Sequence, residues 1–458
     1  MKRVLSFALA LAPALALCAA AAEVAHAQAG VRPRAVQSAE KETDGKGGSA
    51  SEGAKASEAQ ALYEDASKYV ERKFEEFRQK QVPYDRALEQ KTYQEQKDLA
   101  LQNAARLAAR GPLRGTDIYY AGLLYSLAGN GEGALDSLRR FLAEPDGAAP
   151  ELLQRARSVA AQQAAQLGRA EEAEGILADY AKGEPRAVAD LHRINLLVAS
   201  AYVKRKDFAH AAPRAADAYA AALEYARTAA ANPVQRDQTI YGAGAYYASA
   251  LLKSNRRPEA LGVIQEMRAR AVALPSARLY RDATSLLLQT GGELGPPPPL
   301  AGVEPAASPE IQVDEMIGAG PRRLADLRGK VVFLDFWATW CTYCVQTMPR
   351  LNALHQKYKD RGLVILGLNE FEGNIEGREA THAEELEYFR QFKRRMNVSY
   401  DFAVAADAEN DRAFGVSSLP TGVLIDRRGR VRLLTIGASE VEAELLRKTV
   451  LKLLDEQP

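Results

Sequence analysis

Cysteine is scarce in this sequence, since only Cys18, Cys341 and Cys344 occur among 458 residues. So few cysteines exclude a fold held together by a framework of structural disulfides. Histidine is also rare, with 5 residues in the chain. The 60 lysines and arginines are balanced by 59 acidic residues, which argues against a nucleic acid or another polyanion as the partner.

The N-terminus has the pattern of an export signal. Two basic residues precede an uncharged apolar segment at 4–22, and small residues follow at 25–27. We expect a signal peptide at 1–27, a periplasmic or otherwise extracytoplasmic location, and no stable membrane span after cleavage. A retained anchor fits less well because the segment is short and rich in alanine. Lipidation at Cys18 is disfavoured because Leu17 stands where a lipoprotein signal has a small residue.

Three further segments follow from composition. Residues 28–59 contain almost no large apolar residue, so we expect a disordered leader there. Residues 60–293 show helical periodicity rich in alanine and leucine, which predicts an α-helical domain. The proline run within 294–309 predicts a semi-rigid linker that holds this domain apart from a last domain at 310–458.

Four polar breaks divide the helical region into segments of similar form. Each break ends in an alanine, namely Ala134, Ala173, Ala211 and Ala260. Small residues at such points allow paired helices to pack closely. The pattern resembles degenerate tetratricopeptide repeats, although the spacing exceeds the roughly 34 residues of that family. A generic all-α domain without true repeats is the alternative, and in both cases we expect the region to hold a protein partner.

Cys341 and Cys344 lie three residues apart, shortly after an apolar, β-rich run at 331–336. Such a run predicts a buried central strand, which places the pair between this strand and the next helix. If the helix begins at or just after Cys341, free N–H groups and the helix dipole stabilise a thiolate there. Cysteines in such pairs have pKa values of roughly 3.5–7.5 instead of about 8.5. Cys341 is the expected nucleophile, and Cys344 is expected to resolve the mixed disulfide.

A zinc site is the main alternative for a Cys-X-X-Cys pair. It needs a second pair of Cys or His ligands, and none is present. The nearest histidines, His355 and His382, are single residues without the spacing of metal ligands. We therefore expect neither a metal nor another cofactor.

The segment Phe336-Trp337-Ala338-Thr339-Trp340-Cys341-Thr342-Tyr343-Cys344 resembles the active-site segment of the thioredoxin superfamily. Residues from about 310 to 456 are similar to its bacterial TlpA/ResA-type branch in particular. The resemblance implies an α/β thioredoxin-like domain after the all-α, repeat-like domain. It also implies a redox disulfide between the two cysteines.

The same resemblance suggests the remaining site residues. Pro420, in Leu419-Pro420-Thr421, corresponds to the cis-proline that packs beside the cysteine pair, and Trp340, Leu419 and Pro420 are the expected substrate-binding residues. Asp335 lies in an apolar strand, where burial should raise its pKa. In thioredoxins the matching acid shuttles a proton to the second cysteine. Glu372 matches a glutamate near the active site of ResA-type proteins. Glu370 is an equally good candidate for this position by sequence.

These features predict an exported thiol–disulfide oxidoreductase that acts on protein thiols and disulfides. By resemblance, it reduces disulfides in extracytoplasmic proteins such as cytochrome c apoprotein, with electrons from a membrane thiol carrier. Three alternatives remain. They are a peroxiredoxin-type peroxidase, which would need a lone peroxidatic cysteine, an oxidase of the DsbA type, and a binding scaffold whose redox domain is accessory.

Overall fold

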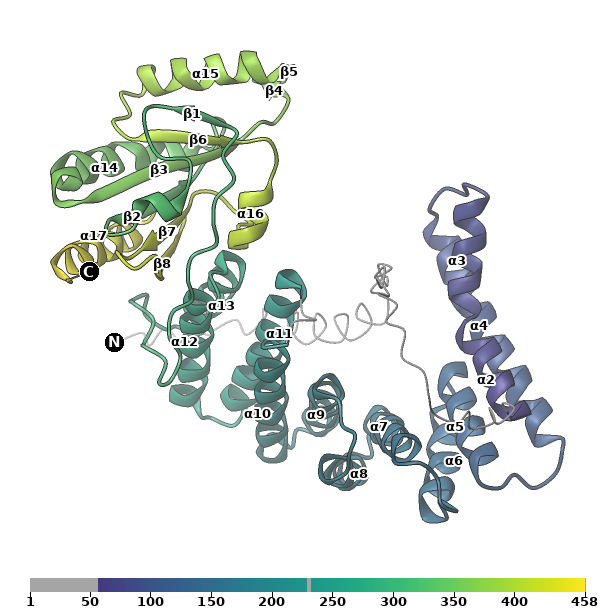
Figure 1. The fold of residues 1–458 in the computed structure, drawn as a ribbon. Coiled ribbons are helices and arrows are strands. Elements are labelled where there is room, and N and C mark those ends of the chain that lie inside the picture. Colours follow the sequence, from purple (N-terminus) through teal and green to yellow (C-terminus); the bar gives the residue numbers. More distant parts are fainter. Residues whose placement is uncertain (1–56, 229–231, 458) are drawn as a thin grey trace, which may run out of the picture. The chain divides into compact units, whose positions relative to one another are not determined.

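The computed structural model describes residues 57–228 and 232–457 (Figure 1). The expected signal peptide and nearly all of the expected leader therefore lie outside the described residues. The chain divides into two compact units, with the boundary in the sequence between Arg186 and Ala187. None of the helices within the described ranges is both long and apolar enough to cross a membrane.

The first unit is entirely helical in its described part. Its helices are α2 (Glu58–Ser67), α3 (Tyr69–Gln79), α4 (Arg86–Ala108), α5 (Thr116–Ala128), α6 (Gly131–Ala143), α7 (Pro150–Gln166) and α8 (Ala170–Lys182). Buried residues of α2, α4 and α5 form one apolar core, which includes Leu62, Leu107 and Leu124.

In its described part, the second unit begins with five helices and continues into a sheet. The helices are α9 (Val188–Lys204), α10 (Phe208–Tyr225), α11 (Pro233–Lys253), α12 (Arg257–Ala273) and α13 (Ala277–Gln289).

Each of the four predicted breaks is a tight turn between two helices. Gly129 and Gly168 take positive φ angles of 79° where α5 and α7 end, and Lys206 and Asn255 adopt φ angles of 60° and 59° in the later turns. Glycine reaches this left-handed region without a steric penalty, and asparagine also tolerates it. These helix pairs confirm the predicted all-α region. Their relationship to tetratricopeptide repeats stays a prediction.

The last part of the second unit is the predicted α/β domain. Its elements are β1 (Glu315–Ile317), η2 (Leu324–Leu327), β2 (Val331–Phe336), α14 (Thr342–Tyr358), η3 (Lys359–Arg361), β3 (Leu363–Glu370), β4 (Asn374–Ile375), β5 (Arg378–Glu379), α15 (His382–Arg395), β6 (Asp401–Ala405), α16 (Glu409–Phe414), β7 (Thr421–Ile425), β8 (Val431–Ile436) and α17 (Glu440–Asp455). The large sheet has the order β1-β6-β3-β2-β7-β8. Strand β2 is parallel to β3 and antiparallel to β7. This arrangement confirms the thioredoxin-like fold.

Side chains from α14, α15 and α17 pack in one apolar core, together with alternate residues of the strands. Residues on the other face of the sheet, such as Leu334 and Leu434, share a second core with Tyr280 and Leu287 of α13. Helices α12 and α13 lie against the edge strand β8 (Figure 1). Helices from the N-terminal side of the proline run thus cover apolar surface of the sheet.

The segment 294–309 differs from the spacer that the sequence suggested. Its last residues pair with the β7–β8 turn, because Ser308 N donates to Gly429 O over 2.9 Å and Ala307 forms a bridge with Arg430. Proline keeps this segment extended but does not prevent the next residues from joining a strand edge. The segment therefore does not hold α13 away from the sheet. Whether the parts before 294 and after 309 fold as separate domains stays a prediction.

Candidate active site

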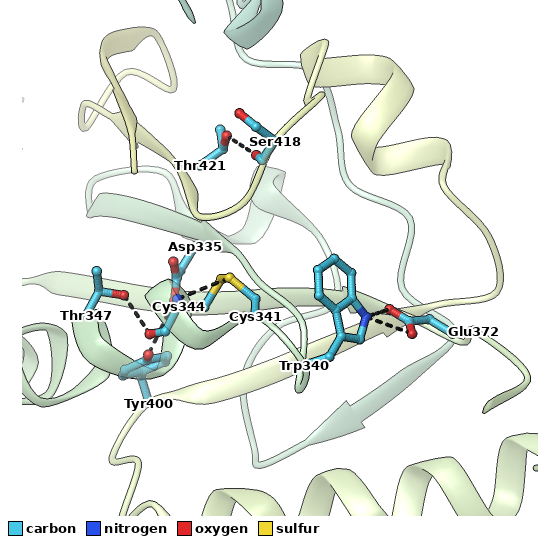
Figure 2. The surroundings of a disulfide bond; sticks show 9 residues. All are labelled: Asp335, Trp340, Cys341, Cys344, Thr347, Glu372, Tyr400, Ser418 and Thr421. Carbon is cyan, nitrogen blue, oxygen red and sulfur yellow. Dashed lines mark hydrogen bonds between the residues drawn. A yellow bond between two sulfur atoms is a disulfide. The ribbon is translucent and has the colours of Figure 1, made fainter. Parts of the chain in front are cut away.

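The two cysteines lie at the strand-to-helix junction that the sequence predicts. All six residues of β2 are buried, and Cys341 is the N-cap of α14. Its Sγ accepts a hydrogen bond from Cys344 N over 3.1 Å, and the two sulfurs form a disulfide (Figure 2). Cys341 is 6% exposed and Cys344 is fully buried. A partner can therefore reach Cys341 more easily than Cys344.

Two large aromatic side chains project near this disulfide. Trp340 and Tyr343 are 66% and 64% exposed, although large apolar residues are usually buried. Trp340 Nε1 donates to both carboxylate oxygens of Glu372, over 2.7 and 2.9 Å (Figure 2). The indole is thus held in one orientation beside Cys341.

Asp335 is buried within β2, as the sequence predicts. Burial raises the pKa of its carboxyl to about 7, partly opposed by a hydrogen bond from the Tyr400 hydroxyl to Oδ2 over 3.4 Å. Gly367 of β3 and Gly422 of β7 are its partners on the two neighbouring strands. Asp335 also lines a pocket of about 400 Å³ beside α14 and α17. This pocket is large enough for ordered water between the carboxyl and the surface.

Pro420 lies just before β7, whose first residue, Thr421, pairs with Phe336 at the end of β2. The Leu419–Pro420 peptide bond is cis, as the resemblance implied. The Pro420 carbonyl accepts a hydrogen bond from Gly437 N over 2.9 Å. This carbonyl is therefore already engaged, and pairing with a substrate chain at Leu419 stays a prediction.

Glu370 and Glu372, which the sequence could not separate, have different surroundings. Glu372 is exposed and holds Trp340, while its own backbone N–H donates to Glu385 of α15 over 2.9 Å. Burial raises the pKa of Glu370, and the nearby Glu372 and Asp407 raise it further. Both glutamates line a second pocket, which borders Trp340 and Leu419.

Several residues of the site escaped the sequence analysis. Tyr400 carried no signal, because a lone tyrosine before a strand gives no hint of the strand it will reach. Glu442 of α17 also lines the pocket of Asp335, and burial raises its pKa to about 7. Its charged neighbour is Arg268 of α12, which lies more than 150 positions earlier in the chain. The described residues contain no cluster of three or more acidic, His or Cys side chains that could hold a metal.

Comparison with known proteins agrees with this geometry. The profile of the AhpC/TSA family matches residues 306–434. Thiol-disulfide oxidoreductase ResA of Geobacillus thermodenitrificans (strain NG80-2) is 31% identical over 137 residues, which are 30% of this chain and 71% of the relative. ResA of Bacillus thuringiensis subsp. konkukian (strain 97-27) is 35% identical over 108 residues, 24% of this chain and 56% of the relative.

A solved structure of a thioredoxin-family thiol:disulfide interchange protein from Chlorobium tepidum TLS is 22% identical. It covers 34% of this chain and 99% of its own, with a TM-score of 0.28. The ResA match reaches more than two thirds of the Geobacillus protein, and the AhpC/TSA profile spans both cysteines. By this likeness the chain belongs to the ResA-type thiol–disulfide oxidoreductases of the thioredoxin superfamily.

Proposed function

We propose that this oxidoreductase works outside the cytoplasm as a reductase of protein disulfides, and that its helical region recruits the partner. The observation that carries the reductase direction is the acidic lining of the pocket at Trp340, the residue that precedes Cys341. Glu370, Glu372, Asp407 and Asp411 line the pocket that Trp340 borders. Negative charge disfavours a thiolate at Cys341, and a less stable reduced form makes a stronger reductant.

The proposed reaction is a balanced exchange of two electrons. The Cys341 thiolate attacks one sulfur of the partner's disulfide, and the other partner sulfur leaves as a thiolate that takes up a proton. Cys344 then loses its proton, attacks Cys341 and releases the second partner thiol. The protein is left with the Cys341–Cys344 disulfide, and a dithiol donor such as a membrane thiol carrier reduces it again.

Asp335 is the proposed base for Cys344. Its raised pKa lets the carboxyl exchange a proton near neutral pH, which suits a general base. The pocket beside it can hold water that exchanges protons between the carboxyl and the solvent. Trp340, Leu419 and Pro420 are proposed to contact the substrate chain next to Cys341.

The substrates proposed are disulfides of exported proteins, including cytochrome c apoproteins. This follows from the export signal expected at 1–27 and from the resemblance to the TlpA/ResA branch. Fractionation of cells that express the full chain tests the location. Retention of the protein in the cytoplasm would overturn it.

The reduction potential of the Cys341–Cys344 couple, measured against glutathione, tests the direction. A reductase should lie near the value of about −270 mV found for thioredoxin, whereas a value near the −120 mV or so of DsbA would establish the oxidase alternative. Full biological activity of a Cys341→Ser/Cys344→Ser variant would instead favour the accessory-domain alternative.

Trapping tests the role of the helices. The Cys344→Ser variant lacks the resolving sulfur, so partners should stay bound through Cys341. Removing residues 57–186, which form the described part of a separate compact unit, should reduce the set of trapped partners if this unit recruits them. An identical set with and without these residues would refute recruitment by the first unit.

A further inference from the structure

The pocket bordered by Trp340 has features beyond those that the exchange reaction needs. It measures about 250 Å³, and its walls include Phe336, Trp340, Leu368 and Leu419. Trp340 immediately precedes Cys341, and Leu419 immediately precedes the cis-proline. A substrate chain whose disulfide is attacked by Cys341 would therefore pass close to this pocket.

Several polar atoms in the lining of this pocket are buried without a hydrogen-bond partner. They are Trp337 Nε1, Asn369 Nδ2, Glu370 Oε2 and Ser418 Oγ. Asn369 is 8% exposed, and its other amide atom, Oδ1, already accepts a bond from Glu370 N over 2.8 Å. An unsatisfied buried polar group costs on the order of 1–3 kcal/mol, so such groups usually have a partner. A ligand that brings both an acceptor and a donor would satisfy them.

The charge of the lining determines which donor fits. Glu370, Glu372, Asp407 and Asp411 face the pocket, and within the described part of the chain its lining contains no lysine or arginine. Arg412 is close enough to lower the pKa of Glu370 and Asp411, but it is exposed and pairs with Asp407 over 3.2 Å. Burial and then Glu370 raise the pKa of Asp411 to about 6. The pocket thus has more negative charge than its own residues neutralise.

The side chains of the pocket suit an organic cation, such as an ammonium or guanidinium group, better than a metal ion. The described residues include no group of three or more acidic, His or Cys side chains arranged to hold a metal. The indole of Trp340, fixed by Glu372, supplies an aromatic face, and such faces attract ammonium and guanidinium groups. Asn369 Nδ2 can donate to a peptide carbonyl, while Glu370 Oε2 and Asp411 can accept from a charged side chain.

We propose that this pocket binds a lysine or arginine side chain of the disulfide-bonded substrate, a few residues from the cysteine that Cys341 attacks. The inference rests on the proposed reductase function and adds a substrate class to it. The protein then prefers disulfides that have a lysine or arginine nearby in the substrate sequence. A neutral or acidic residue at that place leaves the buried Glu370 Oε2 without a partner.

Matched peptides test this selectivity. Each peptide carries one intramolecular disulfide and differs at a single position two residues from a cysteine, where it has lysine, norleucine or glutamate. The reduced full-length protein should reduce the lysine peptide with a second-order rate constant roughly tenfold above that of the norleucine peptide. The glutamate peptide should be the slowest. The preference for lysine should also fall as salt is raised.

The pocket variant is Glu370→Gln combined with Asp411→Asn, which keeps the shape and removes the charge. The quantity compared is the ratio of the lysine to the norleucine rate within each protein, so a change in intrinsic thiol reactivity cancels. A matched control is Glu379→Gln with Asp360→Asn, two exposed acids outside this lining. The ratio should fall toward one in the pocket variant and persist in the control.

The proposal is overturned if the unmodified protein reduces the lysine and norleucine peptides at similar rates. It is also overturned if the lysine-to-norleucine rate ratio of the pocket variant equals that of the unmodified protein. Reduction of the neutral 2-hydroxyethyl disulfide separates this failure from failure of the proposed function. If that reagent is not reduced either, the reductase function itself is wrong. Calorimetry then measures how tightly the lysine and norleucine peptides bind the oxidised protein. Equal affinities overturn the proposal that the pocket binds a basic side chain.

Discussion

Tyr400 donates a hydrogen bond to the buried carboxylate of Asp335 over 3.4 Å, although β3 lies between β2 and β6 in the sheet. Asp335 belongs to the central strand that leads to the cysteines, and Tyr400 immediately precedes β6. Burial raises the pKa of Asp335 to about 7, and this bond opposes the shift. The pair therefore decides at which pH the proposed base of Cys344 becomes available.

Asp335→Asn should slow the release of the partner from the mixed disulfide. In the unmodified protein the release rate should rise as the pH passes through about 7, because the carboxyl must lose its proton to act as a base. The variant should lack this rise. Stopped-flow measurements from pH 6 to 9 check it, and release that is the same in both proteins at every pH would rule out the role.

The same substitution should stabilise the fold at high pH. An aspartate has a pKa of about 3.9 in the unfolded chain, and the folded value here is about 7, so the folded state binds the proton more tightly. The free energy of unfolding should then fall as pH rises between these values. Asp335→Asn removes this loss and should raise the stability by roughly 2–4 kcal/mol at pH 8, with little gain at pH 4. Urea unfolding at both pH values measures the difference, and the exposed Asp326→Asn serves as the control.

Tyr400→Phe should shift the pH dependence of release upward. Without the hydroxyl, the ionised form of Asp335 loses its hydrogen bond, so the pKa of the carboxyl rises further. The ring itself stays packed, and the cost in stability should be about 1 kcal/mol. A release profile with an unchanged midpoint would show that the 3.4 Å bond does not influence Asp335.

Arg268 and Glu442 should be coupled across the second unit. Arg268 is fully buried, with its guanidinium bonded to Tyr280, Thr284 and Gln265, and it lowers the raised pKa of Glu442. Arg268→Met should destabilise the protein by about 3–5 kcal/mol, because Tyr280, Thr284 and Gln265 lose their charged hydrogen-bond partner and Glu442 loses a nearby positive charge. The loss should be smaller in a Glu442→Gln background. A double-mutant cycle measures the coupling, and a value of zero would contradict it.

The site of truncation should decide whether the redox domain survives alone. A fragment from residue 294 loses α11–α13, whose side chains share a core with one face of the sheet, whereas a fragment from residue 187 keeps them. We expect the longer fragment to be monomeric and to reduce insulin. The shorter one should expose apolar surface and aggregate. Size-exclusion chromatography checks both, and a soluble, active 294–458 fragment would show that the helices are dispensable for the fold.

Short-range patterns account for what the sequence revealed. The apolar run at 331–336, the paired cysteines and the polar breaks between helices all act over a few residues, and the structure has each where it was expected. Burial of Asp335 followed from its place in an apolar strand. The cis bond before Pro420 followed from resemblance to a known motif, not from the residues alone.

The sequence by itself determined an all-helical region and a reactive pair of cysteines, because periodicity and spacing are local properties of the chain. The thioredoxin-like domain followed from the resemblance of its motifs to a known family. Only the tertiary structure decided that α12 and α13 pack against the sheet and that Tyr400 reaches Asp335. It also decided that Asn369, Glu370 and Asp411 line one pocket with Trp340. Such contacts join residues from tens to more than a hundred positions apart, and the chain closes them through packing that no short window of sequence contains.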